Sequence, residues 1–152
     1  MSAVLLDTCA IIFIANGQAI HRNAQQEIIA AAAGGGILVS PVSAWEIGLL
    51  SGRKGIVFQP DPTAWFQSFL AYPGVRLTPL TPEIAIDSSF LPPLPAAALT
   101  AIGTGSGGSP RHGDPADRLL IATARALDVP IVTRDRAILT YAQAGHVRVI
   151  AC

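Results

Sequence analysis

The stretch HGDPADRLLIATARALDVPIVTRD, from His112 to Asp135, predicts a helix followed directly by a buried strand, and the rest of the chain is organised around this unit. Asp114 before Pro115 is typical of a helix N-cap followed by proline at the first helical position. The apolar residues that follow predict a helix to about Leu127. The run PIVT, residues 130–133, is short, apolar and β-branched, which predicts a buried parallel strand.

Two acids of this stretch are expected to meet at one edge of the sheet. Asp117 falls in the first turn of the helix, and Asp135 follows the end of the strand. Because a helix runs antiparallel to the parallel strand that comes after it, the start of the helix lies beside the end of the strand. The local pattern therefore predicts that these two carboxylates approach each other.

Composition and charge indicate one globular domain over residues 1–152. Hydrophobic residues make up 51% of the chain and charged residues 13%, which argues against disorder and suits a core that needs no disulfide or metal. Ten basic and ten acidic residues give a formal net charge of zero, so any binding to nucleic acid must be local. Cys9 and Cys152 show no metal-ligand spacing. The beginning MSAVLLDTCA has no basic segment before its apolar residues, so we expect a cytoplasmic protein without a membrane anchor.

Strand and helix signals alternate along the chain. Short strands are expected at residues 4–6, 37–39, 75–78, 130–133 and 146–150. Each of the first four is followed by a Ser, Thr or Asp at which a helix is expected to start. This alternation predicts an α/β fold with three layers, α/β/α, around a five-stranded parallel sheet. A segment with four prolines and four glycines, Leu91 to Arg111, predicts a loop at about 91–111.

Two further acids stand where strands give way to helices. Asp7 directly follows the first strand, and Glu46 falls in the second turn of a helix that Ser40 and Pro41 begin. A glutamate about 9 Å along that helix still reaches the sheet edge, because helical side chains point towards the N-terminus. The structural alternatives are N-capping alone for Asp7 and a capping box with Ser43 for Glu46.

In a parallel sheet, the strand ends and the helix starts that follow them all lie at the carboxyl edge. Four acids are therefore expected in one pocket: Asp7, Glu46, Asp117 and Asp135. Carboxylates about 4 Å apart repel by roughly 4 kcal/mol a pair at an effective dielectric constant of about 20, so a proton or a cation must neutralise them. Oxygen ligands favour Mg²⁺ or Mn²⁺ over zinc. Such a site indicates metal-assisted hydrolysis of a phosphate ester, in which the metal activates a water molecule and no protein nucleophile is needed.

The motifs around the four acids resemble those of a known family. LLDT at Asp7, SAWEIGLL at Glu46, HGDPADRLLIATA at Asp117 and VTRD at Asp135 are similar to the successive motifs of PIN-domain ribonucleases, in particular the VapC-type toxins of bacterial toxin–antitoxin pairs. The resemblance spans nearly the whole chain. It implies that these four residues are the metal-binding and catalytic acids.

The resemblance also implies properties that composition and spacing do not provide. They are a sheet order of 3-2-1-4-5, dependence on Mg²⁺ or Mn²⁺, RNA cleavage, a VapB-like antitoxin and homodimerisation. Thr133 and Asp114 take supporting places in such a site. The Gly/Pro-rich segment at about 91–111 departs from the family pattern, in which a leucine-proline pair precedes the HxDPxD motif closely.

Three arginines are predicted RNA contacts, and two other functions are alternatives to a ribonuclease. Arg118, Arg134 and Arg136 flank the acids and are expected to contact RNA phosphates, solvated helix starts being the alternative. A phosphoacceptor signalling domain also gathers acids around Mg²⁺, but it needs a lysine on a late strand and the only lysine of this chain is Lys54. A non-catalytic PIN-like binding module is the other alternative, which the complete set of acids disfavours.

Overall fold

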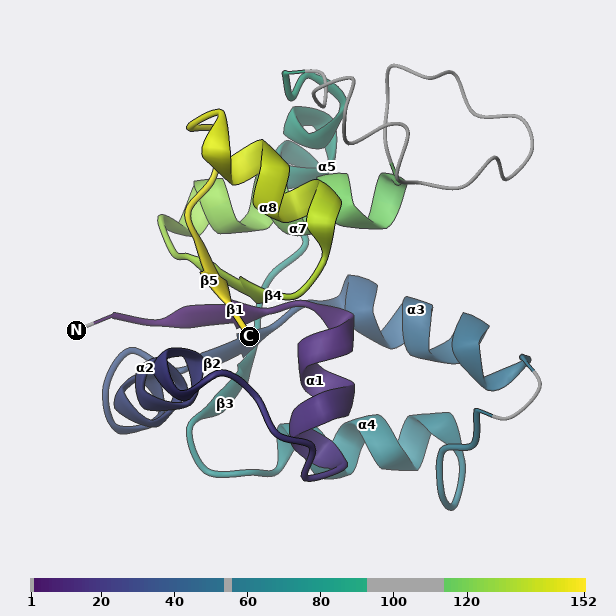
Figure 1. Ribbon diagram of the computed structural model, residues 1–152. Helices are drawn as coiled ribbons and strands as arrows, with labels where there is room; N and C mark the ends of the chain where they lie inside the picture. Colours follow the sequence, from purple (N-terminus) through teal and green to yellow (C-terminus); the bar gives the residue numbers. More distant parts are fainter. Residues whose placement is uncertain (1, 54–55, 93–113) are drawn as a thin grey trace.

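Five parallel strands form one sheet in the order β3-β2-β1-β4-β5 (Figure 1). The computed structural model describes residues 2–53, 56–92 and 114–152. Its strands are β1 (Val4–Leu6), β2 (Ile37–Val39), β3 (Val75–Leu77), β4 (Ile131–Thr133) and β5 (Val149–Ala151). The predicted α/β class and the order 3-2-1-4-5 are therefore confirmed. Receiver-like signalling domains have the order 2-1-3-4-5, so the sheet also disfavours the phosphoacceptor alternative.

Helices cover both faces of the sheet and give the expected three layers. In Figure 1 the sheet separates α5, α7 and α8 from α1, α2 and α4. The helices are α1 (Thr8–Ala15), α2 (Arg22–Ala33), α3 (Pro41–Ser51), α4 (Pro62–Leu70), α5 (Pro82–Ser89), α7 (Pro115–Leu127) and α8 (Arg136–Gln143). Helix α3 packs against both α4 and α7, so it links the two helical layers.

Cap-and-proline signals set the starts of four helices, as the sequence predicts. Ser40, Asp61, Thr81 and Asp114 are the N-caps of α3, α4, α5 and α7, each with proline in the first turn. The Ser40 hydroxyl, for example, accepts a hydrogen bond from a backbone N–H at 3.1 Å. Such a cap contributes about 1 kcal/mol to stability. Because Ser40 caps α3, Ser43 is not its N-cap and the capping-box alternative for Glu46 is wrong.

The central strand β1 is buried on both faces. Val4 and Leu6 belong to the core cluster beneath α1, α2 and α4, whereas Leu5 belongs to the cluster beneath α7 and α8. Burial of each such side chain stabilises the fold by about 1.5–3 kcal/mol. A strand held on both faces gives the residue that follows it, Asp7, a fixed position.

The last strand begins later than its apolar pattern suggests. Val147 is a buried core residue that precedes the strand, and β5 pairs with β4 only from Val149 onwards. The predicted loop lies outside the described residues from position 93 to 111, as does His112. Within the described part of the chain, no helix is long and apolar enough to cross a membrane.

Candidate metal centre

Asp7 and Asp135 follow the ends of the neighbouring strands β1 and β4, and each begins a helix. Asp7 Oδ1 accepts a hydrogen bond from the N–H of Ala10 at 2.7 Å. Asp135 Oδ1 accepts hydrogen bonds from the N–H groups of Ala137 at 2.8 Å and Ile138 at 3.2 Å. Both acids are therefore N-caps as well as strand-end residues. Capping leaves them able to bind a cation, because a carboxylate has about four acceptor positions.

Thr133, the last residue of β4, connects these two acids. Its hydroxyl donates a hydrogen bond to Asp7 Oδ2 and accepts one from the backbone N–H of Asp135 at 2.9 Å. Thr133 is fully buried, so water does not compete for these bonds. The hydroxyl thus orients the Asp7 carboxylate, which is the position in which a supporting residue is expected.

Glu46 is held by a hydroxyl of a neighbouring helix. Thr8 Oγ1 lies 2.6 Å from Glu46 Oε1 and 3.0 Å from Ser43 Oγ, so it joins α1 to α3. A hydroxyl has a single proton. When Glu46 is ionised, Thr8 therefore donates to the carboxylate and accepts the hydrogen bond of Ser43. Thr8 and Ser43 are both buried, which fixes one oxygen of Glu46 near the start of α1.

Thr8 and Ser43 were not among the predicted site residues. Each has a local explanation, since Thr8 follows a capping aspartate and Ser43 lies near the start of a helix. One signal was available: Ser43 and Glu46 are three residues apart on α3, which places both on one face of the helix.

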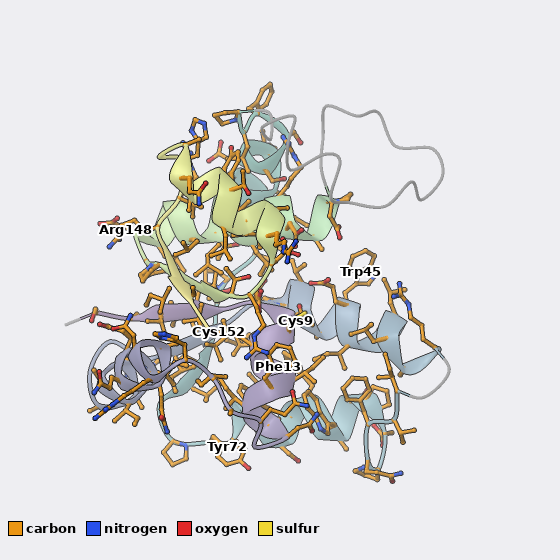
Figure 2. The ribbon with its side chains drawn as sticks, in the orientation of Figure 1. Cys9, Phe13, Trp45, Tyr72, Arg148 and Cys152 are labelled. Atoms are coloured by element: carbon orange, nitrogen blue, oxygen red, sulfur yellow. The ribbon has the colours of Figure 1, made fainter. Side chains whose placement is uncertain are left out.

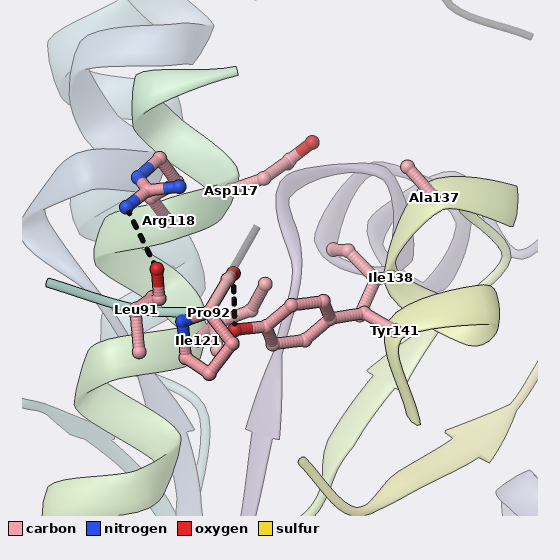
Figure 3. Close-up of a pocket in the computed structure, with 8 residues that line it drawn as sticks. All are labelled: Leu91, Pro92, Asp117, Arg118, Ile121, Ala137, Ile138 and Tyr141. Atoms are coloured by element: carbon pink, nitrogen blue, oxygen red, sulfur yellow. Dashed lines mark hydrogen bonds between the residues drawn. The ribbon is translucent and has the colours of Figure 1, made fainter. Parts of the chain in front are cut away.

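Asp117 lies in the first turn of α7 and lines a small pocket between α7 and α8 (Figure 3). Leu91, Pro92, Arg118, Ile121, Ala137, Ile138 and Tyr141 complete the lining. Burial is the main reason that the pKa of Asp117 rises from 3.8 to about 8, and four nearby carboxylates add to it: Asp135, Asp114, Glu46 and Asp7. At neutral pH, Asp117 therefore holds a proton unless a cation takes its place.

Cys9, in the first turn of α1, shows that the acids share one neighbourhood. Its pKa rises to about 11, first through burial and then through the negative charges of Asp7, Glu46, Asp135 and Asp117. The pKa values of Asp7 and Glu46 are also raised, in both cases mainly by burial. All four carboxylates thus act on the same small region at the carboxyl edge of the sheet.

The donor chemistry of this cluster fits a hard divalent cation. Its donors are carboxylate oxygens, and three of the four acids have raised pKa values, which a bound cation would lower. Across residues 2–53, 56–92 and 114–152, however, no group of three Asp, Glu, His or Cys side chains forms a complete metal ligand set as placed. The acids lie within electrostatic range of one another, and direct metal ligation by them remains a prediction.

Asp114 and Asp117 have different roles at the start of α7. Asp114 is exposed, and its Oδ1 accepts a hydrogen bond from the N–H of Ala116 at 2.9 Å, which confirms its predicted place as N-cap. Asp117 has no such role and faces the pocket. Asp114 therefore supports the helix that presents Asp117.

Arg118 is buried and lies apart from the Asp117 carboxylate. The two side chains leave α7 in different directions in Figure 3. The Nε–H of Arg118 donates to the carbonyl oxygen of Ser88 at 2.9 Å, and a second nitrogen reaches the carbonyl of Leu91. This guanidinium anchors the end of α5, a setting that differs from the exposed phosphate contact expected for it.

Arg134 and Arg136 are exposed beside Asp135 and remain predicted phosphate contacts. The Nε–H of Arg134 donates to the carbonyl of Cys152 at 3.0 Å, and its guanidinium carbon lies 4.2 Å from the centre of the Phe13 ring. Arg134 therefore also ties the C-terminal residue to α1.

Comparison with known proteins agrees with this fold. The model of the PIN domain family matches residues 4–144. No curated protein shows significant sequence similarity to the chain.

Solved structures of VapBC and FitAcB have similar folds. A chain of VapBC2 from Rickettsia felis, bound to a promoter DNA fragment, is 14% identical, with 98% of each chain covered and a TM-score of 0.61. A chain of DNA-bound VapBC from Salmonella typhimurium is 15% identical, with 99% of this chain and 98% of that chain covered and a TM-score of 0.59. A chain of FitAcB from Neisseria gonorrhoeae is 18% identical, with coverage of 97% and 96% and a TM-score of 0.54. At such identities the likeness shows the fold.

Proposed function

The chain belongs to the PIN domain family, and we propose that it is a metal-dependent endoribonuclease that acts as the toxin of a type II toxin–antitoxin pair. It hydrolyses RNA phosphodiester bonds with Mg²⁺ or Mn²⁺ as its cofactor. The observation that carries this proposal is the group of four carboxylates at the carboxyl edge of the sheet, Asp7, Glu46, Asp117 and Asp135. Burial first, and then the charges of neighbouring carboxylates, raise the pKa values of Asp7, Glu46 and Asp117.

The side chains around the acids prepare them to hold the ion. Thr133 orients Asp7, and Thr8 fixes one oxygen of Glu46. Asp114 caps α7 so that Asp117 faces the cluster. When bound, a divalent cation lowers the pKa of a water molecule and stabilises negative charge on the phosphate oxygens. Asp117 gives up its proton when the cation binds, because the added positive charge favours the ionised carboxylate.

The zero net charge of the chain requires local contacts to RNA. Arg134 and Arg136, exposed beside Asp135, supply them. Crowded and partly buried carboxylates destabilise a fold unless they bind something, so a non-catalytic module accounts less well for the cluster. The phosphoacceptor alternative lacks support from the sheet order.

A VapB-like antitoxin is the partner that best fits a toxin of this family. The solved structures with similar folds include VapBC complexes from two organisms, both bound to DNA. A homodimer and action in the cytoplasm, where the RNA substrate lies, belong to the same proposal.

Cleavage of total RNA by purified, antitoxin-free protein tests this function. The wild-type protein should cleave RNA with Mg²⁺ or Mn²⁺ and not with EDTA. Asp7→Asn and Asp117→Asn should each abolish cleavage while the circular dichroism spectrum stays unchanged. Asp87→Asn, on the exposed surface of α5, is the matched control and should cleave like the wild type. Undiminished cleavage by both site variants would exclude the four-acid metal site.

A further inference from the structure

Trp45 is a large aromatic side chain that lies open to solvent beside the acid cluster. It is 56% exposed, whereas the second tryptophan, Trp65, packs against Phe58 and Phe69 with ring centroids at 4.8 and 6.4 Å. Exposure of so large an apolar ring costs free energy in water. The exposed Trp45 is therefore a better candidate for contact with a ligand than the packed Trp65.

The backbone places Trp45 at the rim of the site. Trp45 directly precedes Glu46, whose Oε1 is fixed 2.6 Å from Thr8 Oγ1. Figure 2 shows the ring projecting from α3 towards the side on which α7 begins. The start of α7 carries Asp114 and Asp117, and α3 packs against α7. The ring thus stands on the side of α3 that faces the start of α7.

We propose that Trp45 is a stacking contact for an unpaired base of the RNA whose phosphate lies at the acid cluster. The inference rests on the proposed function. Every base has an aromatic face, and stacking on a protein ring contributes about 1–3 kcal/mol per base. A base inside a duplex has both faces covered, so only unpaired RNA can use this contact.

The charge of the protein explains why such a contact is needed. Its net charge is zero, so phosphate attraction alone gives little affinity. The carboxylates around Glu46 also repel the RNA backbone wherever a cation does not neutralise them. An uncharged contact beside the site holds the substrate whether or not a cation neutralises the carboxylates. Leu49, one turn further along α3 and 51% exposed, gives the same helix face an apolar side chain without an aromatic ring and supplies a matched control.

Fluorescence anisotropy with a labelled, phosphorothioate-linked RNA that resists hydrolysis tests the contact in the presence of Mg²⁺. We expect Trp45→Leu to weaken binding of the single strand by about 10-fold, corresponding to one lost stacking contact, and Trp45→Phe to keep most of the affinity. Leu49→Ala should bind like the wild type. The salt dependence of binding should be the same in Trp45→Leu and wild type, because the contact is not ionic. Binding of the duplex of the same sequence should not change.

Unchanged single-strand affinity in Trp45→Leu would overturn the inference while leaving the proposed function intact, provided that the wild type cleaves ordinary RNA. Equal losses in Trp45→Leu and Leu49→Ala, together with a smaller particle in size-exclusion chromatography, would assign this face to a protein interface instead. Failure of the wild type to bind or cleave RNA would overturn both proposals.

Discussion

Replacement of Asp117 by asparagine should remove a large part of the pH dependence of stability in the metal-free protein. In the folded chain, burial and the neighbouring carboxylates raise the pKa of Asp117 from 3.8 to about 8. Between these two values the folded state holds a proton that the unfolded chain has lost. The contribution of Asp117 to the free energy of unfolding is therefore fully present below the pKa that Asp117 has in the unfolded chain. This contribution is lost as the pH rises through the pKa that Asp117 has in the folded chain.

The size of the effect follows from this proton. One proton that differs between the two states changes the free energy of unfolding by about 1.4 kcal/mol per pH unit. When the pH rises from about 5 to about 7, Asp117 thus lowers the free energy of unfolding by up to about 3 kcal/mol. Asparagine has nearly the same shape and does not titrate, so the Asp117→Asn variant should lack this loss. Without metal, it should be more stable than the wild type at about pH 7.

Urea unfolding at about pH 5, 6 and 7 in EDTA measures the difference between the wild type and the variant. This difference isolates Asp117, because the raised pKa values of Asp7 and Glu46 add a similar dependence to both proteins. Asp87→Asn, exposed on α5, should keep the wild-type dependence. An equal loss of stability from about pH 5 to about pH 7 in the wild type and Asp117→Asn would show that Asp117 does not hold this proton.

Three further predictions concern the residues around the acids. Thr8→Val removes the hydroxyl that donates to Glu46 at nearly constant side-chain volume, so the Mn²⁺ affinity measured by calorimetry should fall about 10-fold. Thr8→Ser keeps the hydroxyl and should keep the wild-type affinity. Equal Mn²⁺ affinities of Thr8→Val and the wild type would contradict the positioning role of Thr8. Asp114→Asn still caps α7, so its free energy of unfolding should change by only a few tenths of a kcal/mol, and its melting temperature should still rise with Mg²⁺. Loss of that Mg²⁺ response would make Asp114 a ligand. Arg134→Gln and Arg136→Gln should each lower the salt slope of RNA binding by about 1, and an unchanged slope would place the RNA elsewhere.

The sequence predicted most of the fold because the signals that determine it are local. The strands β1, β2 and β4 are short runs of apolar or β-branched residues, and Ser40-Pro41 and Asp114-Pro115 mark the starts of two helices. Parallel pairing then brings the strand ends to one edge without further information. For this reason the positions of Asp7 and Asp135 at neighbouring strand ends could be predicted as well.

Contacts between distant elements could not be predicted in the same way. The hydrogen bond from Thr8 to Glu46 joins residues 38 positions apart, and its existence depends on how α1 and α3 pack. The setting of Arg118 depends on such packing as well. Its charge indicates exposure, but the packing of α5 on α7 buries it and directs its Nε–H to the carbonyl of Ser88.

The four acids differ in what holds them, and this difference determines how a cation would act on the site. Backbone N–H groups fix Asp7 and Asp135, and a hydroxyl fixes Glu46. Asp117 lies in the first turn of α7, where burial and the repulsion of its neighbours raise its pKa to about 8 and keep it protonated at neutral pH. A cation must displace that proton before Asp117 can bind it. Metal affinity should therefore rise with pH up to about 8, the pKa of Asp117, because the proton on Asp117 competes with the cation.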